Sequence, residues 1–209
     1  MTAKLLLLLG CFISLKSYCQ NDTIWYKSIC NENLTIPSDV EAKKAIYKGK
    51  DAILIDNMVK KEEGGICLLN DVQFINGTVE FDLASDTFAG ITFRTQNEQL
   101  GECIYFRPFN AGTVKHKRTV QYVAKGTKYT WFYLRENFPG VYESAADIKK
   151  NEWFHVKLEI NGNTVKVYVN NLDEPSLVVN DMKLDVKKGF VGLWTWKAYY
   201  SNLKIVRND

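Results

Sequence analysis

The sequence predicts an all-β fold made of two antiparallel sheets packed face to face. Apolar and polar residues alternate with a period of two in most segments, and turn signals rich in Gly and Asn separate these segments. No amphipathic helical pattern extends beyond one or two turns. About a dozen strands at roughly ten-residue spacing are therefore expected, and a two-sheet sandwich accommodates that number.

Three segments carry the clearest strand pattern: TVEFDLA (78–84), WFHVKLEI (153–160) and TVKVYVN (164–170). Alternation of this kind is typical of half-buried antiparallel strands. Turn signals stand between the strands at NGT (76–78), NGN (161–163), NNLDEP (170–175) and KKG (187–189). The best helical candidate is SDVEAKKAI (38–46), and it is short.

We expect the inward side chains of these strands to form one core. Its predicted members are Val79, Phe81, Leu83, Ile91, Phe93, Ile104, Phe106, Val120, Phe154, Val156, Leu158, Val165, Val167 and Ile205. The segment KYTWFYLRE (128–136) is expected to be a further strand, with Phe132 inward and Trp131 outward.

Residues 1–19 have the layout of a secretory signal peptide, in which Lys4 precedes a short run of leucines and small polar residues follow. The run is much shorter than the roughly 20 apolar residues of a membrane span. Cleavage after Cys19 would leave Gln20 as the new N-terminus. The alternative is a lipoprotein signal at LLGC (8–11), with Cys11 as the acylated residue. Either signal predicts export to the periplasm, the cell surface or the medium of a Gram-negative bacterium.

The remaining chain is expected to form one domain. Residues 20–43 are interpreted as an N-terminal segment that packs on the sandwich, and residues 44–209 as the sandwich itself. Removal of residues 1–19 takes away Lys4 and Lys16 and no acid, so the formal charge falls from +3 to +3 − 2 = +1. Because nucleic-acid binding needs a clustered basic face, nucleic acid is not expected as a partner.

Three cysteines follow the signal: Cys30, Cys67 and Cys103. Since three is an odd number, at most one disulfide can form within a monomer. The chain has no C-x-x-C pair of the kind that binds zinc. We interpret these cysteines as small buried hydrophobic residues.

The middle strands carry unusual outward residues. GITFRT (90–95) and CIYFRPF (103–109) each place an arginine where a sheet normally has an apolar or small polar side chain. Guanidinium, amide and carboxylate groups offer hydrogen-bonding forks, and aromatic rings stack on the C–H face of a sugar. We therefore predict one concave carbohydrate-binding patch that contains Glu80, Asp82, Arg94, Tyr105, Arg107, Gln121 and Trp131. The alternative is that Glu80 pairs with Arg94 across strands as surface bracing.

The succession NGTVEFDLAS, FAGITFRT, CIYFRPF, NEWFHVKLEINGNTVKVYVNN, GFVGLW and YYSNLKI resembles the concanavalin A-like lectin and glucanase superfamily, in its laminin-G-like bacterial branch. The resemblance covers residues 44–206 and implies a jelly-roll sandwich of two curved antiparallel sheets. In many relatives the concave face binds or cleaves glycans. Domains described as 3-keto-disaccharide hydrolases share this architecture, so the resemblance alone does not decide between binding and catalysis.

The motifs of known enzymes on this fold are incomplete. Glucanases of the superfamily carry E-x-D-x-E or E-x-D-x-x-E on one strand, and here Ala84 and Ser85 stand where the second glutamate is needed after Glu80 and Asp82. The strings Q-x-H and YFKAG of the lyases are absent. The sequence therefore favours a carbohydrate-binding, lectin-like domain, with a glycan-degrading enzyme or a structural role without sugar as the alternatives.

Members of the superfamily often hold a structural calcium ion through loop carboxylates and carbonyls. IDN (55–57) and NNLDE (170–174) could supply oxygen ligands, but neither has a diagnostic spacing and an ordinary turn is the favoured interpretation, so the sequence leaves the cofactor open. An oligosaccharide or polysaccharide is the expected partner.

Overall fold

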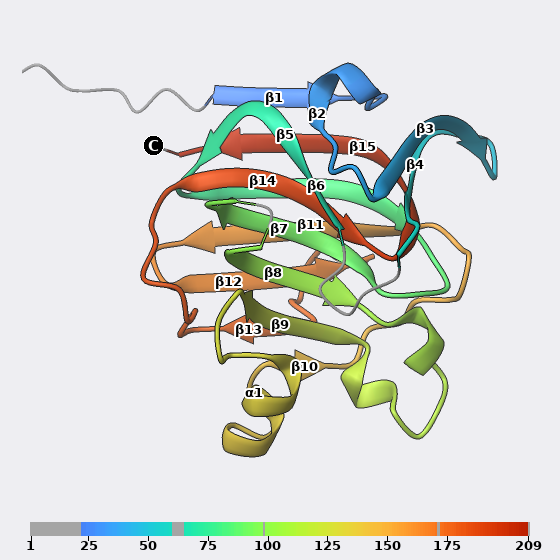
Figure 1. Cartoon of the computed structure of the whole chain (residues 1–209). Helices are drawn as coiled ribbons and strands as arrows, with labels where there is room; N and C mark the ends of the chain where they lie inside the picture. Colours follow the sequence, from blue (N-terminus) through green and yellow to red (C-terminus); the bar gives the residue numbers. More distant parts are fainter. Residues whose placement is uncertain (1–21, 60–64, 98, 171, 209) are drawn as a thin grey trace, which may run out of the picture.

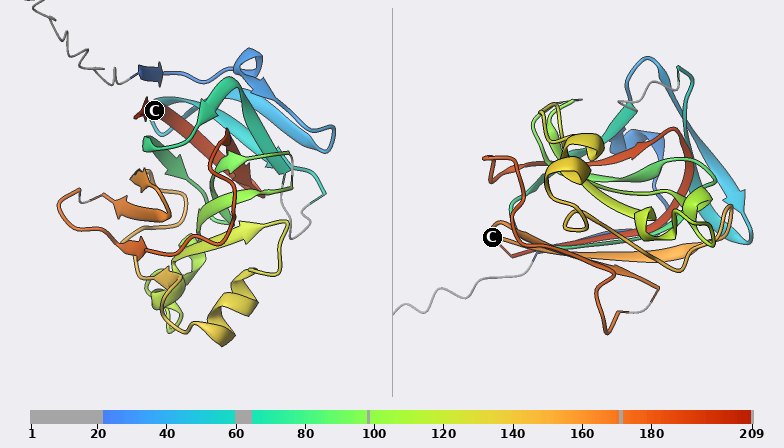
Figure 2. Two further views of the ribbon diagram at one scale, coloured as in Figure 1. Left: turned by 90° about the vertical axis from the view of Figure 1, so that its left-hand side faces the viewer. Right: turned by 90° about the horizontal axis from the view of Figure 1, so that it is seen from below.

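The computed structural model describes residues 22–59, 65–97, 99–170 and 172–208, so the expected signal peptide and Cys11 lie outside the described residues. Two antiparallel sheets pack face to face, as the right-hand view of Figure 2 shows. The all-β sandwich predicted from the alternation is confirmed. Within the described residues no helix is long and apolar enough to cross a membrane.

The eight-stranded sheet contains, in spatial order, β13 (Leu177–Val179), β12 (Thr164–Val169), β11 (Phe154–Asn161), β6 (Gly77–Ala84), β15 (Lys197–Arg207), β4 (Lys50–Asn57) and β3 (Val40–Tyr47). Strand β1 (Asp22–Tyr26) also belongs to this sheet and pairs with the end of β15, so that Asp22 lies opposite Arg207. The first and last described strands are thus neighbours (Figure 1).

The seven-stranded sheet contains, in spatial order, β10 (Glu143–Ser144), β9 (Val120–Lys125), β8 (Gly101–Phe106), β7 (Ala89–Thr95), β14 (Gly189–Thr195), β5 (Gly65–Phe74) and β2 (Leu34–Thr35). Residues 22–43 thus contribute strands to both sheets. Three short 3-10 helices occur, η1 (Asn31–Asn33), η2 (Pro108–Asn110) and η3 (His116–Arg118), together with one α-helix, α1 (Trp131–Asn137).

The core lies between the two sheets. Every residue predicted for it from the alternation is at most 2% exposed, with the exception of Phe132. Phe132 is 59% exposed because its segment is not a strand but helix α1. Thr130 caps this helix by accepting a hydrogen bond from the backbone N–H of Tyr133, and Leu134 is its buried residue.

The segment expected to be helical, residues 38–46, also differs from the prediction. It forms strand β3, which pairs with β4 along its whole length. Lys48 and Gly49 connect the two strands with positive φ angles of 46° and 78°. A two-residue turn of this kind matches the twist of a hairpin, so pairing overrides the local helical pattern.

Glu102 of β8 is a fully buried carboxylate at one end of the core. Its Oε2 accepts a hydrogen bond of 2.5 Å from the Tyr122 hydroxyl, and its Oε1 accepts one of 3.0 Å from the backbone N–H of Leu184. Burial raises the pKa of Glu102 to about 7, because these hydrogen bonds and the charge of Arg94 offset only part of the desolvation.

The described cysteines form no disulfide. Cys67 and Cys103 are fully buried, as the sequence predicts, whereas Cys30 is partly exposed. Burial raises the pKa of both core thiols to about 12, so they remain protonated and unreactive at neutral pH.

Candidate functional site

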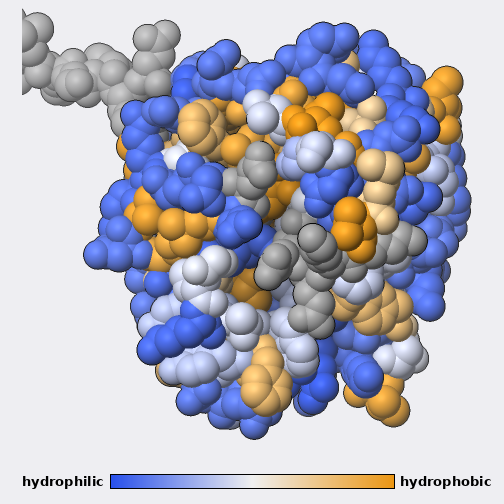
Figure 3. Space-filling view, in the orientation of Figure 1, coloured by the Kyte–Doolittle hydropathy of each residue, from blue (hydrophilic) through white to orange (hydrophobic). Residues whose placement is uncertain are grey.

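A cleft of about 890 Å³ lies over the face of the seven-stranded sheet that points away from the other sheet. Strands β8, β9 and β14 form its floor, and the loop 107–119 and helix α1 border one end. On the molecular surface of Figure 3, apolar patches lie among hydrophilic residues. The cleft combines an aromatic part and a cationic part.

Five aromatic rings form the aromatic part. Trp194 packs edge-on against Tyr105, with their ring centroids 5.0 Å apart. Phe88 packs against Trp196 at 4.7 Å and against Phe109 at 5.0 Å. Because neighbouring residues of a strand point to opposite faces, the alternating sequence LWTW (193–196) turns both tryptophans toward the cleft. Tyr105 and Trp194 are buried, each 4% exposed, whereas Phe88, Phe109 and Trp196 are partly exposed and provide flat apolar surfaces of the kind on which sugars stack.

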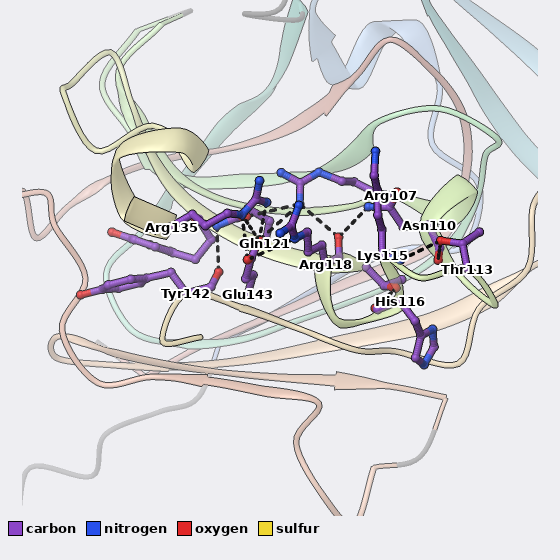
Figure 4. A network of polar contacts seen from close by, with 12 residues as sticks. Arg107, Asn110, Thr113, Lys115, His116, Arg118, Gln121, Arg135, Tyr142 and Glu143 are labelled. Atoms are coloured by element: carbon purple, nitrogen blue, oxygen red, sulfur yellow. Dashed lines mark hydrogen bonds and ion pairs between the residues drawn. The ribbon is translucent and has the colours of Figure 1, made fainter. Parts of the chain in front are cut away.

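Three arginines converge on one carboxylate in the cationic part (Figure 4). Glu143 lies on β10 opposite Gln121, and Arg135 of α1 binds it in bidentate fashion, with Nε–Oε1 and Nη2–Oε2 distances of 2.8 and 2.5 Å. Arg107 and Arg118 each approach the same carboxylate to 3.8 Å. One anion thus holds three cations together.

Arg107 lies at the end of β8 and is only 5% exposed. Its guanidinium donates to the Tyr105 hydroxyl at 2.6 Å, to the Arg118 carbonyl at 3.1 Å and to Oε1 of Gln121 at 3.3 Å. Gln121 is fixed in turn because its amide donates to the Tyr142 carbonyl. Burial lowers the pKa of Arg107 from its ordinary value, and the facing Tyr105 ring and Glu143 oppose this effect.

Three of the seven predicted site residues, Tyr105, Arg107 and Trp131, line this cleft, and a fourth, Gln121, is buried and accepts a hydrogen bond from Arg107. Tyr105 of β8 lies opposite Gln121 of β9, and Arg107 follows directly after β8. Trp131 also lies here, although on a helix rather than a strand, and its ring faces the guanidinium of Arg135 at 4.9 Å. Arg94, Glu80 and Asp82 do not join them, so the expectation of one shared patch is wrong for these three residues.

Arg94 points into the sandwich and not toward the cleft. Phe93 and Arg94 together oppose Val191 of β14, which is a β-bulge, and Arg94 adopts a positive φ of 50°. This breaks the strict alternation on which the prediction depended. The guanidinium donates to the carbonyls of Ile75 and Gly162, at 2.9 and 2.7 Å, and therefore braces the turn that connects the two sheets and the β11–β12 turn of the eight-stranded sheet.

Glu80 and Asp82 lie on β6, on the outer face of the eight-stranded sheet. Asp82 accepts hydrogen bonds from His155 at 2.9 Å and from Lys50 and Asn202 at 2.7 Å each. Burial alone would raise the pKa of Asp82, but these three donors outweigh it and hold the pKa at about 2. Neither carboxylate pairs with Arg94 or Arg107, because the sheets separate them.

The segment 55–57, considered for calcium, makes other contacts within the described residues. Asp56 pairs with Lys197 at 2.8 Å, and Oδ1 of Asn57 accepts the backbone N–H of Val59. The segment 170–174 is only partly within the described residues. The described chain brings no three His, Cys, Asp or Glu side chains together as metal ligands.

Several cleft residues were not predicted. They are Arg118, Arg135 and Trp196, which line the cleft, and Glu143, which pairs with the arginines. These residues come from loops, the helix and a two-residue strand, where the alternation of a regular strand cannot be used to predict the direction of a side chain. Two signals were present in the sequence: the basic run HKR (116–118) and the alternating tryptophans of LWTW.

A comparison with protein families identifies the chain. The model of the 3-keto-alpha-glucoside-1,2-lyase-like domain matches residues 25–206. The chain belongs to this family. The match covers strands of both sheets and the entire cleft, so the 3-keto-alpha-glucoside-1,2-lyase-like domain is the whole sandwich. No curated protein matches the chain.

Solved structures share the sandwich of this 3-keto-alpha-glucoside-1,2-lyase-like domain. The carbohydrate-binding module CBM66 from Bacillus subtilis has a TM-score of 0.52 and 16% identity, over 84% of this chain and 92% of that chain. A candidate glycosyl hydrolase from Parabacteroides distasonis has a TM-score of 0.56 and 14% identity, over 87% and 98%. A protein of unknown function with a galectin-like fold from Bacillus subtilis has a TM-score of 0.54 and 11% identity, over 85% and 90%. The neighbours are carbohydrate-related sandwich domains, and at these identities they establish the fold alone.

Proposed function

We propose that this protein is an exported domain that binds an oligosaccharide in the cleft of the seven-stranded sheet. The observation that carries the proposal is the combination of the partly exposed rings of Phe88, Phe109 and Trp196 with the guanidinium groups of Arg107 and Arg118 in one open cleft. Aromatic rings offer stacking surfaces to sugar C–H groups, and guanidinium groups donate to hydroxyl and acidic oxygens. The signal-like residues 1–19 support export, because a glycan-binding domain meets polysaccharides outside the cytoplasm.

Internal hydrogen bonds fix the buried side chains at the cationic end of the proposed binding cleft. Arg107 is held by three hydrogen bonds, and Gln121 by its bonds to the backbone. Preorganised donors reduce the entropy that binding must overcome. The proposed cleft therefore acts through rigid side chains on strands, with the loop 107–119 and helix α1 as its border.

Replacement of Trp196 by Ala should weaken oligosaccharide binding about tenfold, which corresponds to roughly 1.4 kcal/mol of lost stacking. Isothermal titration of residues 20–209 with a panel of neutral and acidic oligosaccharides measures this effect. Trp25→Ala is the matched control, since Trp25 is 65% exposed on β1 of the other sheet. Binding that is unaffected by Trp196→Ala, or is lost equally in Trp25→Ala, would contradict the assignment of the cleft.

A second candidate function is a lyase acting on a 3-keto-glucoside, and the family match favours it. Such a 1,2-elimination needs a base to take the proton from C2, next to the ketone at C3, while the substituent at C1 leaves and a C1–C2 double bond forms. Among the described residues that line the cleft, Asp39 is the carboxylate available for this role. Glu143 is less suited, because Arg135 engages both of its oxygens.

The lyase candidate predicts that the unmodified protein releases the C1 substituent from a 3-keto-disaccharide. Asp39→Asn should then reduce turnover by at least about a hundredfold while binding of the substrate persists. Chromatography of the products over time measures the rate of release for the unmodified protein and for the variant. If the unmodified protein binds oligosaccharides but releases nothing, the domain acts by binding alone.

A further inference from the structure

The border of the cleft at helix α1 carries surplus positive charge. Arg107, Lys115, Arg118 and Arg135 contribute four positive charges, whereas Glu143 and the exposed Glu136 contribute two negative charges, so the described cluster sums to 4 − 2 = +2. The nearest other acid that lines the cleft, Asp39, precedes β3, beside the opposite edge of the sheet. Among the described residues, Asp39 forms no ion pair with this cluster.

The surplus charge includes donors that are ready to bind. The Arg118 side chain is 43% exposed, and its closest approach to Glu143 is that of Nε, at 3.8 Å. Among the described residues, none accepts a hydrogen bond from the two Nη groups of Arg118, nor from Nζ of Lys115. Both side chains line the cleft and belong to the same short segment, 115–118. Two terminal guanidinium N–H groups form the fork that matches a carboxylate or a sulfate.

From this arrangement, and resting on the proposed function, we infer that the ligand is an acidic oligosaccharide whose carboxylate or sulfate binds Arg118 and Lys115 at the border of the cleft. Glu143 already compensates Arg135, and it holds the cluster together without neutralising it. A neutral sugar would leave two positive charges uncompensated beside the buried Arg107. An acidic unit removes this repulsion and accepts the free hydrogen bonds.

The two parts of the cleft also define how the ligand lies. Tyr105 connects the aromatic part to the cationic part, because its ring packs against Trp194 and its hydroxyl accepts a hydrogen bond from Arg107. The acidic unit is therefore placed over the segment 115–118. The next unit along the ligand stacks over the partly exposed ring of Trp196.

Matched acidic and neutral ligands test the inference. Trimers of galacturonate and of mannuronate are compared with their fully methyl-esterified forms, which differ from them only in charge. At least one acidic trimer should bind at least about tenfold more tightly than its ester. A rise in NaCl from about 50 to about 500 mM should weaken the binding of the acidic trimer and not that of the ester. Arg118→Gln should remove this preference, so that the acid and its ester then bind with similar affinity. Arg207→Gln, an arginine of β15 on the other sheet, is the matched control and should change neither.

The outcomes separate the inference from the proposed function. If acids and esters bind with equal affinity, or if only neutral members of the oligosaccharide panel bind, the inference is wrong and glycan binding stands. If Arg118→Gln retains the preference for the acidic ligand, other residues bind the ligand's carboxylate and the inference is likewise overturned. If no oligosaccharide binds at all, the proposed function fails and the inference fails with it.

Discussion

The free energy of unfolding should fall by roughly 3 kcal/mol as the pH rises from about 4.5 to above 7, because a buried carboxyl group must lose its proton. The group is Glu102, whose pKa is raised from its ordinary value of 4.5 to about 7 by burial in the core. Between these two values the folded state binds more protons than the unfolded state, so stability is full below pH 4.5 and decreases through pH 7.

The pH dependence of stability expected from Asp82, on the outer face of the eight-stranded sheet, has the opposite direction. The hydrogen bonds that hold the pKa of Asp82 at about 2 stabilise the fold above its ordinary value of 3.8 and are lost as the pH falls toward 2. The two windows do not overlap. The decrease between pH 4.5 and pH 7 can therefore be assigned to Glu102 without correction for Asp82.

Urea unfolding at several pH values, followed by tryptophan fluorescence, measures the effect. Glu102→Gln is the decisive variant, since an amide of the same shape cannot ionise. Its stability should change little across the same window, whereas the unmodified protein should lose stability. A flat profile for the unmodified protein would show that Glu102 stays ionised when buried, with Arg94 as its effective counterion.

Replacement of Arg94 by Met should destabilise the fold by roughly 3 kcal/mol and leave ligand affinity unchanged. The guanidinium is 1% exposed, donates to the turns at Ile75 and Gly162, and supplies the positive charge nearest to Glu102. Met fills a similar volume but makes none of these hydrogen bonds. The loss should grow with pH, because the carboxylate of Glu102 then ionises without this cation.

Arg118→Gln provides the reverse comparison. Arg118 is partly exposed and lines the cleft, so its replacement should reduce ligand affinity while the melting temperature stays within about 1–2 °C. Thermal unfolding and titration of both variants separate the structural arginine from the binding arginine. If Arg94→Met reduces affinity without a loss of stability, our placement of Arg94 is wrong.

The fold could be predicted because most strands bury one face and expose the other. Val79, Phe81 and Leu83 of β6 are all fully buried, as their alternation indicates. Prediction failed where the pattern was short. A seven-residue segment such as Trp131–Asn137 contains too few repeats to distinguish a period of 2 from one of 3.6.

The candidate site was predicted in part. Tyr105 and Gln121 belong to regular strands and Arg107 follows directly after one, so alternation placed them on one face. The bulge at Arg94 could not be foreseen, since a single extra residue reverses the direction of a side chain. Assigning Glu80 to the same face required knowledge of which sheet β6 joins, and local alternation carries no information about strand order.

The pairing of β1 with the end of β15 also affects how the domain can be attached to anything larger. Asp22 and Arg207 lie opposite each other on the eight-stranded sheet, whereas the cleft lies over the other sheet. A lipid, a linker or a neighbouring module joined at either side of residues 22–208 would hold the domain from the same corner. The binding surface would remain free to face outward, and the domain could be inserted into a longer chain with little separation between its entry and exit points.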